Sequence, residues 1–264
     1  MTADLLSPNV VPTVQVGGLR IACLTRAQTA ETVIAEALAR RGTGRPPALF
    51  TSANGEVLSR VARDARLGRI FAAADLVSAD GQPMVIASRW LTRQPLPERV
   101  ATTDLFHDVA ARAPEHDIGI YLLGATPEEN AKAVRNVRLL YPRLRVVGAR
   151  DGYFPPAEGA RVAAEIAALS PDILWIALGV PREQDFAVRH RRALRGVGVI
   201  KTSGGLLNFL SGTRSRAPGL MQRAGFEWLY RLALEPRRLF RRYAVTNLHA
   251  SFLLLVGTQS ERES

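Results

Sequence analysis

Short apolar segments alternate with amphipathic segments along most of this chain, and this alternation constrains the fold more than any other feature. Between the apolar segments, apolar residues recur at helical spacing, for example over 55–67. Strands that are apolar along their whole length, with helices between them, are typical of a parallel sheet covered on both faces. We therefore predict an α/β fold with a Rossmann-like, mostly parallel sheet. The predicted strands are 48–51, 75–79, 118–123, 145–148, 172–178 and 197–201.

Both ends of the chain depart from this alternation. Alternating apolar residues on either side of a Gly-Gly pair predict a small N-terminal β-hairpin over 13–25. Thr25 and Gln28 then form a capping-box pattern that opens a helix. Near the C-terminus, arginines and aromatic residues replace the strand-like segments. We expect two parts: an α/β core with its hairpin over 1–211, and an arginine-rich helical appendage over 212–264.

The composition leaves one alternative function open and excludes several kinds of site. The chain has 35 Lys and Arg against 24 Asp and Glu, and its formal net charge is +11. This excess, with arginines and aromatics interleaved in the appendage, admits a basic nucleic-acid-binding α/β protein, although no recognition motif accompanies it. Cys23 is the single cysteine and the four histidines show no metal-ligand spacing. No signal-peptide pattern is visible in 1–17, and we expect a cytoplasmic protein.

Glycine or a small polar residue follows each predicted strand. Ligands of open α/β sheets bind beyond the carboxyl ends of the strands, where glycine lets the backbone approach and helix N-termini offer N–H donors to phosphate. The strand exits together therefore favour a nucleotide or another phosphorylated ligand, although each turn alone also needs glycine for its geometry. The exits are Ser52-Ala-Asn54-Gly55, Asp80-Gly81, Gly124-Ala-Thr126, Asp151-Gly152, Gly179-Val-Pro-Arg-Glu183-Gln184 and Ser203-Gly-Gly205.

Several motifs of nucleotide-binding and hydrolytic enzymes are absent from the sequence. No G-x-G-x-x-G follows a strand and no Walker lysine loop is present, which disfavours NAD enzymes and P-loop ATPases. There is also no G-x-S-x-G nucleophile elbow. No D-x-D carboxylate pair is available to hold a divalent ion on a diphosphate. We therefore expect no cofactor and no metal.

Asp80 is the carboxylate that stands out. It follows a buried strand and precedes Gly81, at the edge where ligands bind. A carboxylate in this place can act as a general base. It can equally cap the helix that begins near Pro83, and the spacing does not separate the two roles.

Several longer motifs are distributed between residue 14 and residue 243. They are Ser52-Ala-Asn54, Asp80-Gly81 with the strand before it, 99–105, Tyr121-Leu-Leu-Gly124, 141–154, Leu178-Gly-Val-Pro181, Arg216-Ala-Pro218 and 227–238. Together they resemble the WecG/TagA/CpsF bacterial glycosyltransferases, glycosyltransferase family 26. This resemblance implies an inverting transfer of a hexose or N-acetylhexosamine-type sugar from a UDP-sugar to a sugar on a polyprenyl diphosphate, at the cytoplasmic face of the membrane and without a metal. A cytosolic enzyme that modifies nucleotide sugars would need a cofactor fingerprint or a redox group, which the sequence lacks.

The resemblance also implies roles for individual residues. Asp80 corresponds to the catalytic base, which would deprotonate the acceptor hydroxyl in line with the anomeric carbon. The hydroxyl and amide of Ser52 and Asn54 correspond to a T-x-N turn that holds substrate. Three arginines of the appendage would close over the active site and meet a diphosphate. The predicted substrate-binding residues are Ser52, Asn54, Gly124, Gly179, Glu183, Gln184, Arg231, Arg238 and Arg241.

Two motifs depart from the family pattern. The family usually reads G-x-P-K-Q-E, whereas here a carboxylate at Glu183 and an amide at Gln184 are exchanged. Because neighbouring side chains on a helix diverge by about 100°, we expect one of them to contact the sugar or acceptor and the other to be solvated. We favour Glu183 as the contact. Asn208 stands where the family has Asp, and we expect the neutral amide to affect donor selectivity.

The apolar stretch 244–256 extends the appendage. As a helix it spans roughly 20 Å, which is shorter than the bilayer core of about 30 Å. Phe240, Ala244, Leu248 and Phe252 form a stripe at four-residue spacing. We expect this stripe to lie in the membrane interface, with arginines near anionic headgroups. Packing of the stripe on the core, or on a second copy in a homo-oligomer, is the alternative.

Overall fold

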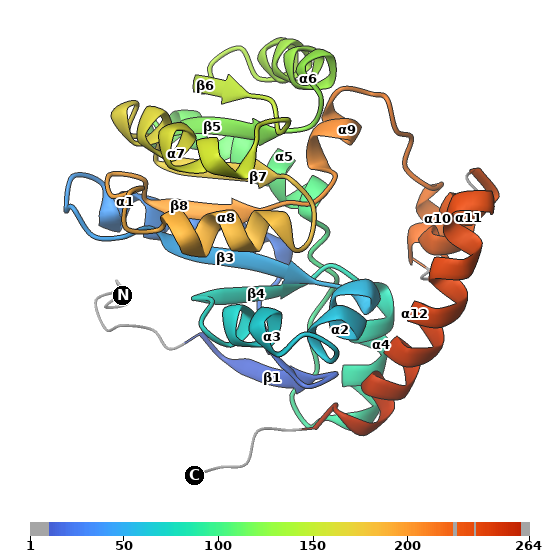
Figure 1. The fold of residues 1–264 in the computed structure, drawn as a ribbon. Helices are drawn as coiled ribbons and strands as arrows, with labels where there is room; N and C mark the ends of the chain where they lie inside the picture. Colours follow the sequence, from blue (N-terminus) through green and yellow to red (C-terminus); the bar gives the residue numbers. More distant parts are fainter. Residues whose placement is uncertain (1–10, 224–225, 235, 260–264) are drawn as a thin grey trace.

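A computed structural model describes residues 11–223, 226–234 and 236–259 (Figure 1). Its centre is a six-stranded sheet with the strand order β4-β3-β8-β7-β5-β6, and every neighbouring pair is parallel. The predicted α/β fold is therefore confirmed. The strands are β3 (Ala48–Ala53), β4 (Leu76–Ala79), β5 (Gly119–Gly124), β6 (Arg145–Arg150), β7 (Ile173–Ala177) and β8 (Val199–Thr202).

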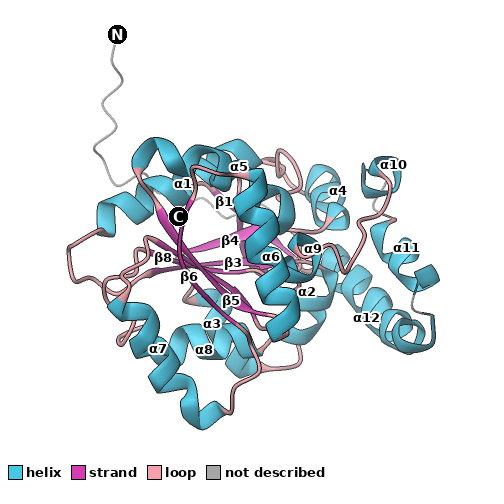
Figure 2. Cartoon of the chain, turned by 90° about the horizontal axis from the view of Figure 1, so that it is seen from above, coloured by secondary structure: helices cyan, strands magenta, loops and turns pink. Residues whose placement is uncertain are grey.

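Helices cover both faces of the sheet, because successive strand side chains point to opposite sides. In β7, Ile173 and Trp175 belong to one buried cluster, and Leu174 and Ile176 to another. The first cluster includes side chains of α1 (Arg26–Arg40), α5 (Thr102–Arg112), α6 (Pro127–Leu140) and α9 (Leu206–Leu210). The second includes side chains of α7 (Gly159–Ala168) and α8 (Arg182–His190). Figure 2 shows these two layers with the sheet between them.

The N-terminal hairpin forms as predicted and adds a third buried cluster. Strands β1 (Thr13–Val16) and β2 (Leu19–Ala22) are antiparallel, and both glycines of the turn have positive φ, 58° and 85°. Their apolar side chains pack with residues of α2 (Gly55–Val61), α3 (Ala65–Ala72) and α4 (Gln82–Leu91). The hairpin thus supports the helices that follow β3 and β4.

Local capping signals decide where several helices begin and end. Thr25 with Gln28 forms the predicted capping box. The single helix expected over 55–67 is wrong, because Asp64 accepts hydrogen bonds from the backbone N–H groups of Arg66 and Leu67 and so begins α3 as a separate helix. Short 3-10 helices follow at Ala113–His116 and Pro156–Glu158.

The C-terminal segment returns to the sheet edge where the strands end. It consists of α10 (Gly219–Arg223), α11 (Glu227–Leu234) and the long α12 (Pro236–Val256), which lies against α2 and α4 (Figure 1). Leu254 is buried in the cluster that contains the hairpin. Beyond α12, Gly18 donates a backbone hydrogen bond to the Gly257 carbonyl, and Gln259 pairs with Gln15. Among the described helices, none has the length and apolarity that a membrane span requires.

Candidate active site

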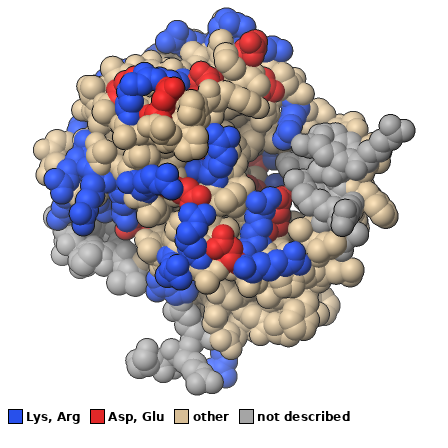
Figure 3. All heavy atoms as spheres, viewed as in Figure 1, with Lys and Arg blue, Asp and Glu red and all other residues tan. Residues whose placement is uncertain are grey.

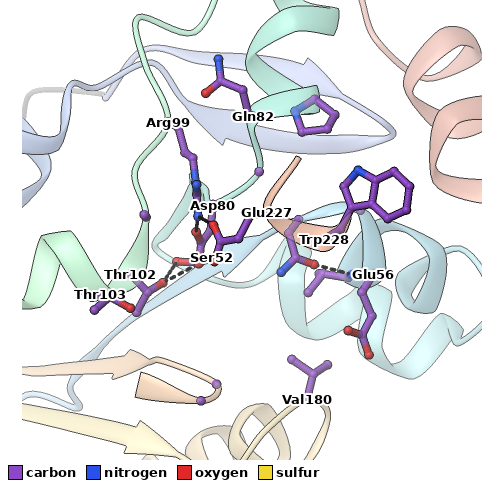
Figure 4. Close-up of a pocket in the computed structure, with 18 of the residues that line it drawn as sticks. Ser52, Glu56, Asp80, Gln82, Arg99, Thr102, Thr103, Val180, Glu227 and Trp228 are labelled. Carbon is purple, nitrogen blue, oxygen red and sulfur yellow. Dashed lines mark hydrogen bonds and ion pairs between the residues drawn. The ribbon is translucent and has the colours of Figure 1, made fainter. Parts of the chain in front are cut away.

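Two adjoining cavities open at the edge where the parallel strands end. The first, of about 420 Å³, lies beyond β3, β4 and β8, and side chains of α11 and α12 form part of its wall (Figure 4). The second, of about 940 Å³, lies beyond β5, β6 and β7. Asn54 and Arg214 line both cavities. The strand exits thus line one continuous edge of the molecule.

Asp80 lies in the first cavity, at the carboxyl end of β4. Its side chain is 23% exposed, and its Oδ2 atom accepts a hydrogen bond of 3.0 Å from the Thr102 hydroxyl. Arg99 lies 3.4 Å from its Oδ1 atom. The capping role is not what the structure shows: Gly81 occupies the N-cap of α4, and no side chain donates or accepts a capping hydrogen bond there.

Charged neighbours surround Asp80 on two sides. Burial raises the pKa of Asp80 above its ordinary value, Arg99 and Thr102 act to lower it, and Glu227 acts to raise it. Glu227 begins α11 and forms a 2.8 Å ion pair with Arg99. One guanidinium therefore links the candidate base to the C-terminal segment, as Figure 4 shows.

Ser52 and Thr102 connect Asp80 to a buried lysine. The Lys201 ammonium donates a 2.8 Å hydrogen bond to Ser52 Oγ, and the Thr102 hydroxyl lies 3.2 Å from the same oxygen. Lys201 has no solvent-exposed surface. Ser52, a candidate substrate-binding residue, thus lines the cavity while its hydroxyl oxygen accepts a hydrogen bond from the buried Lys201 ammonium.

Glu183 and Gln184 are both buried, with 2% and 1% of their surface exposed. The expectation that one of them is solvated is therefore wrong, because the first turn of α8 is enclosed by the sheet edge. Glu183 lines the first cavity, and its carboxylate accepts backbone N–H groups from Gly179 and Gly204. Gln184 Oε1 is buried and has no hydrogen-bond partner among the described residues. Burial raises the pKa of Glu183 to about 7, although the two N–H donors and Lys201 lower it.

Of the other residues predicted to bind substrate, Asn54 and Gly179 line a cavity, whereas Gly124 packs against a strand. Asn54 lines both cavities and caps α2 by accepting the Val57 N–H. Gly179 lines the second cavity with a φ of 77° and free space where a Cβ would be. Gly124 packs against β7, since a Cβ there would lie 2.2 Å from the Ala177 carbonyl oxygen. Its substrate contact stays a prediction.

The appendage arginines stay a prediction too. Arg231, Arg238 and Arg241 lie in α11 and α12, but their side chains are outside the described part of the chain.

Three of the four residues of the predicted apolar stripe on α12 have described side chains. Phe240, Leu248 and Phe252 are 67%, 77% and 58% exposed, so the alternative that they pack on the core of this chain is wrong.

Four polar residues of the site were not singled out from the sequence: Arg99, Thr102, Lys201 and Glu227. Each nevertheless has a feature in the sequence that could have marked it as a candidate. The first two lie in the motif 99–105. Lys201 is one of only two lysines beside 33 arginines, and Glu227 is one of two acids in the basic segment 212–242.

Basic side chains, with acidic ones scattered among them, lie on the face shown in Figure 3. Several surface arginines form ion pairs with acids. Arg66 pairs with Asp185, and Arg191 with Asp75. Within the described residues, no group of three or more His, Cys, Asp or Glu residues is placed to hold a metal ion. The first cavity is therefore lined by carboxylates, hydroxyls and arginines at the strand ends, with Lys201 behind Ser52.

Comparison with known proteins identifies the family to which this geometry belongs. The sequence matches the glycosyl transferase WecG/TagA/CpsF family over residues 14–263. The chain belongs to this family. It is also 31% identical over 198 residues to a Bacillus spizizenii protein named N-acetylglucosaminyldiphosphoundecaprenol N-acetyl-beta-D-mannosaminyltransferase, an alignment that covers 75% of this chain and 76% of that protein. The resemblance inferred from the motifs is thereby confirmed.

Membership of the WecG/TagA/CpsF family makes this protein a glycosyltransferase. The nucleic-acid-binding alternative is set aside, because the match spans nearly all of the α/β core and the appendage. The family assignment also gives the strand-end cavities a purpose, since a glycosyltransferase must hold a donor and an acceptor side by side.

Proposed function

We propose that this glycosyltransferase moves a hexose or N-acetylhexosamine-type sugar from a UDP-sugar to a sugar on a polyprenyl diphosphate, with Asp80 as the general base. One observation carries the proposal: Asp80 is a partly exposed carboxylate on the wall of the strand-end cavity, held by Thr102 and Arg99. The name of the Bacillus relative supports the acceptor class, since it describes a diphosphoundecaprenol-linked sugar.

The chemistry is a single displacement with inversion. The acceptor hydroxyl loses its proton to Asp80 and forms a bond to the anomeric carbon of the donor. The bond between that carbon and the diphosphate oxygen breaks, and UDP leaves with the electron pair. A base is needed because a neutral hydroxyl is a weak nucleophile, and a positioned base contributes about 10² to 10⁴ in rate.

The larger cavity has groups suited to the donor. Arg60, Arg182 and Arg214 line it, and guanidinium groups bind diphosphates through paired hydrogen bonds. Gly179 and Gly204 leave room for a ligand at the same wall, because no described atom beyond the adjacent residues lies within 4 Å of where a Cβ would be. Their N–H groups already donate to Glu183, so the arrangement supports donor binding by the arginines, and we propose that the reaction needs no metal.

The exposed stripe of α12 supports a peripheral place on the membrane. Phe240, Leu248 and Phe252 point away from the core on a helix that also helps to wall the first cavity. A lipid-linked acceptor lies in the bilayer, and an interfacial helix would bring the cavity to it. We propose that the protein acts at the cytoplasmic membrane face on anionic lipid.

The decisive experiment measures UDP release from a panel of UDP-sugars, with and without a synthetic polyprenyl-diphosphate-linked sugar. We expect release with one donor class, only when the lipid-linked acceptor is present, and with activity retained in EDTA. UDP release at the same rate with and without the acceptor, or no UDP release with any UDP-sugar, contradicts the proposed reaction. Loss in EDTA that Mg²⁺ or Mn²⁺ restores contradicts metal independence alone.

A further inference from the structure

Lys201 is a buried cation beside the site to which the proposed reaction gives no role. It lies in β8, between β3 and β7, and none of its surface is exposed. The other lysine of the chain, Lys132, is exposed on α6. An ammonium removed from water is costly unless polar groups compensate it. Lys201 donates hydrogen bonds to Ser52 Oγ at 2.8 Å and to the Thr202 carbonyl at 2.9 Å.

Two hydroxyl groups connect this ammonium to the candidate base. Thr102 Oγ1 lies 3.2 Å from Ser52 Oγ and 3.0 Å from Asp80 Oδ2. A threonine hydroxyl has one hydrogen, so the two acceptors compete for it. Ser52 Oγ already accepts from Lys201, and a carboxylate is the stronger acceptor. The Thr102 hydrogen is therefore directed to Asp80.

Charges around Lys201 come from two elements besides its own strand. Asp80 after β4 and Glu183 in α8 both act to raise its pKa, while burial lowers it to about 8. Lys201 is thus mainly protonated at neutral pH. Asp80 itself is faced by Arg99, by Thr102 and by Glu227 of α11. Lys201 thus adds a positive charge near the carboxylate besides that of Arg99.

We propose that Lys201 is a positioning residue for the transfer reaction. Acting through Ser52 and Thr102, its ammonium holds Asp80 Oδ2 in place and favours the ionised carboxylate. This leaves Asp80 Oδ1, whose contact with Arg99 is long at 3.4 Å, to take the acceptor proton. The inference rests on the proposed function, because it presumes that Asp80 is the base.

The test uses the fact that the full chain has only two lysines. Protein labelled with 13C at lysine Cε gives two lysine signals, and Lys132→Met leaves only that of Lys201. We expect the pKa of Lys201 to fall in Asp80→Asn by about one unit, because a neighbouring negative charge is lost. This measurement needs no substrate and no variant at position 201.

The second arm reads out the reaction. Lys201→Met should move the acidic limb of kcat against pH upward by about one unit, since the carboxylate loses a favourable charge. Lys201→Arg should restore part of the original profile, and Lys132→Met should leave it unchanged. A purely structural role would lower the yield or the melting temperature without moving the limb.

The outcomes separate the two proposals. A wild type that transfers no sugar refutes the proposed function, whatever the lysine titration shows. A wild type that transfers sugar, with a Lys201 pKa unaffected by Asp80→Asn, overturns the positioning role. An acidic limb that stays in place in well-folded Lys201→Met overturns it as well.

Discussion

At the scale of single residues, the state of the Asp80 carboxyl group results from opposing influences. Burial and Glu227 raise its pKa, whereas Arg99 and Thr102 lower it. A base must be ionised at the working pH yet basic enough to accept a proton, so a raised pKa suits this role. Thr102 and Arg99 also hold the carboxylate at the cavity wall.

Asp80→Asn should keep the fold and lower kcat about 10² to 10⁴-fold, because the amide is nearly isosteric but cannot accept the proton. Sugar transfer at saturating donor and acceptor, with a thermal melt, checks this. Asp108→Asn is the matched control, since Asp108 is 25% exposed and pairs with Arg26 outside the two cavities. Wild-type turnover in Asp80→Asn would exclude Asp80 as the base.

Glu183 should make the fold less stable as pH rises. Its pKa is raised from 4.5 in the unfolded chain to about 7 in the folded protein, so the folded state holds a proton between these values. The contribution of Glu183 to the free energy of unfolding is then fully present below pH 4.5 and is lost as pH rises through 7. Glu183→Gln should flatten this fall, as measured by urea unfolding at several pH values. An unchanged slope, equal to that of the surface control Glu115→Gln, would contradict it.

At the scale of elements, an ion pair joins α11 to the edge of the sheet where the candidate site lies. Glu227 and Arg99 are 14% and 17% exposed, so solvent screens their attraction only in part. The α12 helix adds a second fastening through its packing on α2 and the Ser59–His249 hydrogen bond of 2.9 Å. The wall of the first cavity is thus held at two separate points.

Glu227→Gln should loosen α11 and lower the pKa of Asp80, because a negative charge near the carboxylate is lost. We expect backbone amides of α11 to exchange hydrogen several-fold faster, and the acidic limb of kcat to move to lower pH. Hydrogen-exchange mass spectrometry and a pH profile measure the two effects. Glu128→Gln, at an exposed position of α6, is the control. Exchange equal to that of the control would show that the ion pair does not hold α11.

The elements were predictable to the extent that local chemistry decides them. The capping box at Thr25 begins α1 as expected, because both of its partners lie within one turn, and a second box at Thr126 begins α6 in the same way. The Lys201–Ser52 contact joins residues 149 positions apart. It depends on β8 lying beside β3, and the order of strands in a sheet leaves no mark in a local pattern.

At the scale of the whole molecule, apolar side chains on α12 remain uncovered in a single chain. Phe240, Leu248, Phe252 and Leu255 are each more than half exposed. Large apolar side chains gathered on one helix usually meet a membrane or another protein. The basic character of the chain favours an anionic surface as the partner.

A double variant of Leu248 and Phe252 to Ser should bind anionic vesicles at least about tenfold more weakly and keep the wild-type melting temperature, since burying each side chain contributes about 1.5–3 kcal/mol. Vesicle flotation measures this. The control replaces Leu139 and Leu140 of α6, which are 78% and 62% exposed, by Ser. Equal flotation of the two double variants would contradict a membrane face on α12. A wild-type dimer that this change dissociates would assign the face to a second copy.

The fastening of the chain beyond α12 to the hairpin has a mechanical consequence. Gly257 and Gln259 are bonded to residues of the hairpin, so this end of the helix is a fixed pivot. A helix with the 21 residues of α12 is about 30 Å long. If α12 rotates by about 10° about this end, Pro236 at its other end moves by roughly 5 Å. Widening the cavity mouth beside α11 by such a rotation therefore requires the Ser59–His249 and Glu227–Arg99 contacts to part, while the end of α12 near Gly257 hardly moves.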